Sequence, residues 1–149
     1  MQASRLLLLV AGGILPILTA CAPLIQMPSP SADGPRISNL VFDPSDTFVG
    51  CTVTMRFHYQ AADAEITGGL ARWSVAHGRR LTIDGLALPR DAFDGKDAGD
   101  VSIPLTLRNT GSYRYRVQIE DSMGRRSNVL EQGAHAEVTW AWWIAPCAR

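Results

Sequence analysis

The sequence lacks the features that mark most enzymes and nucleic-acid-binding proteins. It contains no GxSxG elbow, no phosphate-binding loop and no glycine-rich dinucleotide fingerprint. Its 14 Lys and Arg residues balance 14 Asp and Glu residues, so no excess of positive charge points to nucleic acid. Beyond the apolar N-terminal run, no segment has good helical periodicity. These absences favour a non-catalytic all-β protein without a cofactor.

Long apolar runs are also scarce, and the one present lies at the N-terminus. A single arginine, Arg5, precedes an apolar stretch from Leu6 to Ala20. This stretch of about 15 residues is shorter than the roughly 20 that a helix needs to span a bilayer. A positive start, a short apolar core and small residues before a cleavage point are typical of secretory signal peptides. We therefore assign residues 1–20 to a signal peptide.

Cysteine is rare, and the first of three stands where the apolar run ends. The tetrapeptide LTAC, Leu18 to Cys21, resembles the lipobox of bacterial lipoproteins. The resemblance implies cleavage before Cys21, acylation of its sulfur and a lipid anchor, which is stable with two or more acyl chains. Because Ala22 and not aspartate follows, it also favours the outer membrane, facing the periplasm or the surface. A secretory signal cut after Ala20 by chance and an uncleaved anchor remain alternatives.

The next residues predict a tether. Residues 21–35 comprise the lipidated cysteine and APLIQMPSPSADGP, a segment rich in proline, serine and small residues. Fully extended, this segment reaches at most about 45–50 Å, which would hold a domain clear of the lipid headgroups. The remaining residues 36–149 are enough for one small domain.

From residue 36 onward the apolar pattern has a period of two. Five runs alternate apolar and polar residues, and shorter candidates are RISNLVF and RRLTIDGLAL. Such one-sided patterns are typical of antiparallel sheets with one solvated face, and Gly, Asn and Asp clusters separate the runs. The sequence therefore predicts an antiparallel β-sandwich of about seven strands. The residues expected to point inward are Cys51, Val53, Met55, Phe57 and Tyr59; Ala71, Trp73 and Val75; Val101, Ile103, Leu105 and Leu107; Tyr113, Tyr115, Val117 and Ile119; and Val138, Trp140, Trp142 and Ile144.

The pattern resembles the immunoglobulin-like domains of bacterial surface and periplasmic proteins. ISNLVFDPSDTFVGCTVTMRFHY looks like their first two strands, and GSYRYRVQIEDSMGRRSN looks like their penultimate hairpin. The resemblance places Tyr113 at a tyrosine corner and Trp73 at the core tryptophan of the third strand. Tyr115 occupies one place of the usual cross-sheet cysteine pair, which is a departure from antibody-type domains.

Two cysteines remain once Cys21 is assigned to lipidation. An oxidising compartment favours a disulfide between Cys51 and Cys147, with two free buried thiols as the alternative. In an immunoglobulin-like sandwich the last strand runs parallel to the first. The resemblance therefore implies that Cys147, after the last strand, lies near Cys51 at the start of the second strand.

Two surface features are candidates for binding a ligand or a partner. If the third and sixth strands pair as the resemblance suggests, Arg72, Arg114 and Arg116 project from one outer face, which is suited to an anionic glycan, a lipid headgroup or an acidic partner. Trp143 is expected to face outward beside the inward Trp140 and Trp142, as interface or sugar-stacking tryptophans do. The alternatives are a solvated sheet face with Arg stems covering apolar surface and ordinary packing of Trp143.

An acidic loop offers a weak calcium site. Asp91, Asp94, Asp97 and Asp100 could supply oxygen ligands, but their spacing of three differs from the alternate-residue pattern of known calcium loops. We expect a solvated loop without a bound metal. The sequence as a whole favours a lipid-anchored protein-interaction or structural module of the bacterial envelope with a protein partner. The alternative function is a glycan- or lipid-headgroup-binding module that uses the Arg face and Trp143.

Overall fold

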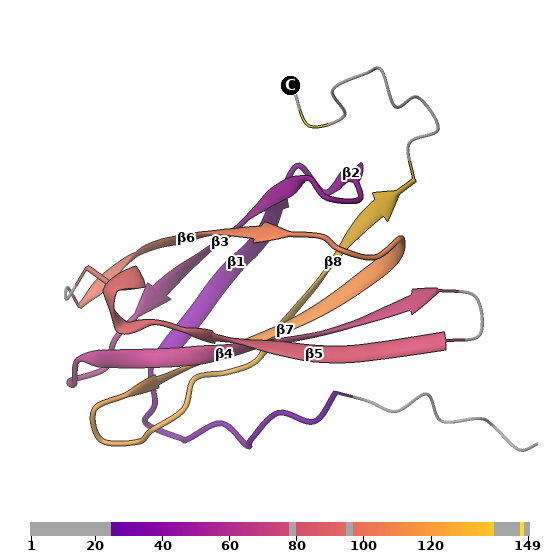
Figure 1. Ribbon diagram of the computed structural model, residues 1–149. Coiled ribbons are helices and arrows are strands. Elements are labelled where there is room, and N and C mark those ends of the chain that lie inside the picture. Colours follow the sequence, from indigo (N-terminus) through magenta and orange to yellow (C-terminus); the bar gives the residue numbers. More distant parts are fainter. Residues whose placement is uncertain (1–24, 78–79, 95–96, 139–146, 148–149) are drawn as a thin grey trace, which may run out of the picture.

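Two β-sheets pack face to face in the computed structural model (Figure 1), which describes residues 25–77, 80–94, 97–138 and Cys147. The three-stranded sheet has the order β1–β3–β6, and the five-stranded sheet has the order β2–β8–β7–β4–β5. The all-β sandwich predicted from the alternating pattern is therefore confirmed. The elements are β1 (Arg36–Asp43), β2 (Asp46–Phe48), β3 (Thr52–Gln60), β4 (Ile66–His77), β5 (Arg80–Leu88), the short 3-10 helix η1 (Arg90–Ala92), β6 (Ala98–Thr106), β7 (Gly111–Asp121) and β8 (Leu130–Glu137).

The core lies between the sheets and is formed by the inward positions of the alternating runs. Every second residue of β3 from Val53 to Tyr59 is buried, together with the preceding Cys51. The inward positions of β7 are also buried from Tyr113 to Ile119. Trp73, Ile103 and Leu105 are partly buried and pack against this core. In the described ranges, no helix has the length and apolar character of a membrane-spanning segment.

Tyr115 joins the two sheets where a cross-sheet disulfide is usual in related folds. Its ring centroid lies 4.6 Å from that of Phe42 in the opposite sheet and 5.6 Å from that of Trp73 on β4. Tyr113 makes the expected corner: its hydroxyl donates to the Asn109 carbonyl at 2.9 Å and accepts the Asn109 N–H at 2.8 Å. An aromatic cluster thus replaces the covalent cross-link within the core.

The first strand changes sheets, which brings the two cysteines together. β1 pairs with β3, whereas β2 pairs in parallel with β8 in the other sheet. The Val49 N–H then donates to the Glu137 carbonyl at 2.9 Å, so the end of β8 lies close to the start of β3. Cys51 and Cys147 form a disulfide with a Cα–Cα distance of 5.2 Å. The predicted pairing is confirmed.

The final strand differs from its expected position. β8 begins at Leu130, before the expected start at His135, and Ala134 and Ala136 are its buried inward residues. These small side chains, next to Gly133, give a weak apolar signal in the sequence. Val138 follows the end of the strand and is half exposed, so its expected burial is wrong. Trp140, Trp142, Trp143 and Ile144 lie outside the described residues.

We predict that replacing both disulfide cysteines, as in the double variant Cys51→Ser and Cys147→Ser, lowers the free energy of unfolding by roughly 2–5 kcal/mol. The reason is that the link closes a loop of 96 residues and restricts the unfolded chain. Urea unfolding with and without reductant measures the change. The double variant serves as the control, because reductant should not affect it. Equal stability of oxidised and reduced chains would contradict this prediction.

Candidate functional site

The outer face of the five-stranded sheet, which points away from the three-stranded sheet, carries the predicted arginines. Arg72 on β4 and Arg116 on β7 are directly opposite each other in the antiparallel register. Arg114 lies two residues from Arg116 on the same side of β7. The pairing of β4 with β7 that the resemblance implied is therefore present, and it brings the three residues to one face.

The Glu131 carboxylate on β8 forms ion pairs with two of these arginines. Arg114 Nε lies 3.2 Å from Glu131 Oε1, and Arg116 Nε lies 2.7 Å from Glu131 Oε2. The Arg116 side chain is 24% exposed, compared with 65% for Arg114. Arg116 is therefore held within the face, whereas most of the Arg114 side chain is exposed to solvent.

The two more enclosed arginines hold residues 25–34, which we call the strap. Arg116 Nη1 donates to the Ile25 carbonyl at 2.6 Å, and Arg72 Nη1 donates to the Gln26 carbonyl at 2.8 Å. Ile25 itself is buried. Residues that the sequence assigns to an extended tether thus lie along the outer face, beneath β4 and β7 (Figure 1).

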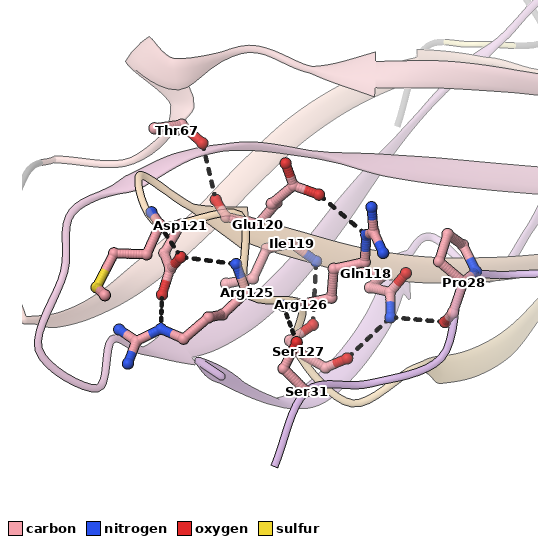
Figure 2. Close-up of polar contacts among 11 residues, drawn as sticks. Pro28, Ser31, Thr67, Gln118, Ile119, Glu120, Asp121, Arg125, Arg126 and Ser127 are labelled. Carbon is pink, nitrogen blue, oxygen red and sulfur yellow. Dashed lines mark hydrogen bonds and ion pairs between the residues drawn. The ribbon is translucent and has the colours of Figure 1, made fainter. Parts of the chain in front are cut away.

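The strap explains why one expectation for β7 is wrong. Alternation predicts that Gln118 faces solvent beside Arg116, but Gln118 is buried. Its Nε2 donates to the carbonyls of Pro28 at 3.1 Å and Ser127 at 2.9 Å (Figure 2). A glutamine amide satisfies these carbonyls at a position where an apolar residue would leave them without a donor.

The other end of the strap is fixed to the segment that follows β7. The Ser31 N–H donates to the Arg126 carbonyl at 2.9 Å, and the Arg126 N–H donates to Ser31 Oγ at 3.0 Å. Gly34 follows at very close range, because a Cβ atom added there would lie 2.3 Å from the Arg126 carbonyl oxygen. The strap therefore needs a residue without a side chain at this point.

A buried carboxylate shapes the turn to which the strap is fixed. Asp121 Oδ1 accepts the N–H groups of Met123 at 3.0 Å and Arg125 at 2.9 Å, and Oδ2 accepts Arg125 Nε at 2.8 Å (Figure 2). The Asp121 side chain has no exposed surface. Arg125 also pairs with Asp63 from the β3–β4 connection. The turn is thus closed around one charge that lies inside the protein.

The electrostatic balance in this turn favours the ionised carboxylate. Burial by itself raises the pKa of Asp121, but the hydrogen bonds from Arg125 and Met123 and the Arg125 charge outweigh it and lower the pKa from its ordinary value. Asp121 is therefore a structural charge at neutral pH and not a proton donor. This assignment excludes the most buried acid of the described chain as a general acid.

The segment after the turn connects β7 to the other sheet. Ser127 Oγ accepts the Ile119 N–H at 3.0 Å. The Asn128 side chain donates to the Ile37 carbonyl and accepts the Ile37 N–H, both at 2.9 Å. An amide side chain thus pairs with β1 as a neighbouring strand would.

Beyond Ile25, the residues that the structure describes leave a hollow on this outer face. Its lining combines small and apolar residues, among them Ala76, Leu81 and Gly133, with the charged side chains of Arg114, Arg116 and Glu131. Leu81 and Ile83 point outward on β5 and are 39% and 43% exposed. The sequence pattern of RRLTIDGLAL indicates only a short strand and does not show that these two side chains are exposed.

The acidic loop does not gather its carboxylates. Asp94 accepts the Tyr59 hydroxyl, whereas Asp100 lies 3.1 Å from His58 Nδ1 on β3. Within the residues that the structure describes, no group of three or more His, Cys, Asp or Glu side chains could hold a metal ion. Asp91, Asp94, Asp97 and Asp100 therefore do not form the weak calcium site that four carboxylates in one loop suggested.

Comparison with known proteins yields similarity of fold. No protein-family model and no curated protein sequence matches the chain. The PKD domain of an M14-like peptidase from a Thermoplasmatales archaeon matches with 17% identity and a TM-score of 0.48, covering 70% of this chain and 96% of that chain. Spo0M, a sporulation control protein from Bacillus subtilis, matches with 9% identity and a TM-score of 0.43, covering 71% of this chain and 50% of that chain.

A third solved structure is a family 76 glycoside hydrolase from a bovine Bacteroides thetaiotaomicron strain. It matches with 13% identity and a TM-score of 0.44, covering 70% of this chain and 21% of that chain. This chain thus spans half or less of the sporulation protein and the hydrolase. The likeness concerns the β-sandwich fold alone.

We predict that Asp121→Asn lowers the free energy of unfolding by about 3 kcal/mol at neutral pH, because Arg125 loses its buried partner and keeps only Asp63. In the natural chain the pKa of Asp121 is lower in the folded than in the unfolded state. Its contribution is therefore complete above about pH 4 and is lost as pH falls through the folded-state pKa. Urea unfolding across this pH range measures both effects. Asp33→Asn, at an exposed strap position, is the control, and an acid response equal in the natural chain and Asp121→Asn would contradict the assignment.

We predict that Gly34→Ala displaces the strap, because the added methyl group would overlap the Arg126 backbone. Hydrogen exchange of the Ser31 amide should become about tenfold faster or more, which corresponds to a loss of about 1.4 kcal/mol in local stability. Ala32→Ser, at an exposed neighbouring position, is the matched control. Unchanged exchange in Gly34→Ala would show that the strap tolerates a side chain there.

Proposed function

We propose that this chain is a lipid-anchored, non-catalytic protein of the bacterial envelope, whose sandwich binds another envelope protein. The observation that carries the proposal is the Cys51–Cys147 disulfide. Disulfides persist mainly in oxidising compartments such as the periplasm and the cell surface. The signal segment and the LTAC motif lead to the same compartment, on evidence independent of the disulfide. Ala22 supports the outer membrane as the final location.

The polar groups of the described chain support a structural role over catalysis. Asp121 and Arg125 close a turn, Arg72 and Arg116 hold the strap, and Asn128 joins the sheets. Each of these side chains is occupied by backbone groups or by a partner of opposite charge. A general acid, base or nucleophile needs access to a substrate as well as a suitable pKa. The arrangement is that of a scaffold.

The same contacts favour one of the two binding functions. A module for anionic glycans or lipid headgroups would need free guanidinium groups, but Arg72 and Arg116 donate to strap carbonyls. Arg114 alone of the three keeps most of its side chain exposed. Trp143 lies outside the described residues and adds nothing to this comparison. We therefore favour a protein partner over a soluble ligand.

Intact mass of the chain from native membranes, with and without reductant, tests the anchor and the compartment together. We expect a chain that starts at Cys21, carries acyl mass and gains two protons on reduction. Cys21→Ser is the control and should remain unacylated. A natural chain without acyl mass would overturn the lipid anchor.

Capture at the membrane then tests the binding function. One stoichiometric envelope protein that co-purifies with the anchored chain would support a protein partner. A shift of tryptophan fluorescence on addition of soluble cell-wall fragments, with no such protein present, would support the ligand-binding alternative instead.

A further inference from the structure

The strap fixes how far the domain can lie from its anchor. Because residues 25–34 are held against the outer face, only residues 22–24 separate Cys21 from docked chain. Four residue steps span at most about 14 Å. The full tether expected from the sequence would have allowed about 45–50 Å. An acyl group on Cys21 therefore brings Ile25, and the outer face on which it lies, close to the lipid surface.

Two exposed apolar side chains of β5 lie at or beside the hollow on this face. Leu81 lies opposite Ala76 and Ile83 lies opposite Ser74 in the β4–β5 register. Each of these two exposed apolar side chains therefore has a small residue as its cross-strand neighbour. Arg114 lies at the same hollow. Apolar side chains that enter the headgroup region together with a cation that meets anionic lipid are typical of interfacial binding.

Both outer faces carry charges of both signs. The outer face of the five-stranded sheet carries Arg72, Arg114 and Arg116 together with the carboxylates of Glu131, Glu120 and Glu137. The outer face of the three-stranded sheet carries matched pairs, Arg56 with Asp43 and His58 with Asp100. Val41 is the large apolar side chain exposed there, among the described residues. Charge therefore does not distinguish the two outer faces, whereas the short chain after Cys21 and the exposed Leu81 and Ile83 belong to the five-stranded side.

We propose that the patch formed by Leu81, Ile83 and Arg114 rests on the anionic phospholipid surface that holds the acylated Cys21, so that the strap orients the sandwich with its five-stranded sheet toward the membrane. This inference rests on the proposed lipid anchor. The short free chain argues for the membrane over a second copy, because a second copy would have to enter the space between this face and the lipid.

The test compares two exposed β-branched positions on opposite faces. Ile83→Cys and its matched control Val41→Cys, which are 43% and 46% exposed as natural side chains, are each labelled with a thiol-reactive fluorophore. The acylated full chain is placed in vesicles of phosphatidylethanolamine and phosphatidylglycerol with headgroup nitroxide lipid. We expect quenching at position 83 to be several times that at position 41. Equal quenching, or stronger quenching at position 41, would overturn the proposal.

Two further readings separate the possible failures. Intact mass is recorded first: without acyl mass the proposed anchor fails and the orientation fails with it, whereas an acylated chain without differential quenching refutes the orientation alone. Self-quenching of the fluorophore at position 83 in vesicles without nitroxide would show a second copy on the patch and also overturn the proposal. Leu81→Cys replaces Ile83→Cys if the latter loses the native melting transition.

Discussion

The ionised carboxylate of Asp121 is the interaction on which much of this structure depends. It accepts three hydrogen bonds from the turn that follows β7, and that turn sets the path of the next residues. Arg126 then meets the strap, and Asn128 pairs with Ile37 at the start of β1. One buried charge thus connects the five-stranded sheet, the three-stranded sheet and the N-terminal segment. An apolar side chain at this position would leave two backbone N–H groups and the Arg125 side chain without this acceptor, which is costly away from water.

The sequence predicted those parts of the fold that depend on local periodicity. Alternation along β3 and β7 identified the core positions, and the fold resemblance led to the Tyr113 corner and the disulfide. Alternation alone places Gln118 in solvent, because it gives no information about the strap, whose Pro28 lies 90 positions away in the sequence. β2 was missed because three residues are too few for a periodic signal. The sequence predicted that Arg72, Arg114 and Arg116 share one face, but it did not predict that Arg72 and Arg116 bind the strap. Their acceptors are backbone carbonyl groups of a distant segment, which local composition does not reveal.

The strap shows that a proline- and serine-rich segment after a lipobox-like motif can be bound to the folded domain. Composition of this kind predicts a spacer, because it cannot form its own core. Here its carbonyl groups are used as acceptors by Arg72, Arg116 and Gln118, which are side chains of the folded domain. The segment therefore acquires order from the sheet and not from its own residues. The same contacts occupy the arginines that would otherwise form a free cationic face, so strap binding and soluble-anion binding compete for the same groups.

The proposed orientation limits where a protein partner can bind. With the five-stranded sheet turned toward lipid, as proposed, the outer face of the three-stranded sheet points away from the membrane. That face carries the Arg56–Asp43 and His58–Asp100 pairs and the exposed Val41, a mixed surface of the kind found at the rims of transient interfaces. The disulfide holds Cys147 beside the start of β3. This part of the sandwich lies near Gly111, where β7 begins, whereas the Asp121 turn follows the other end of β7. A partner that approaches from the aqueous side would thus meet the three-stranded sheet and the disulfide end, while the strap and the anchor remain beneath the domain.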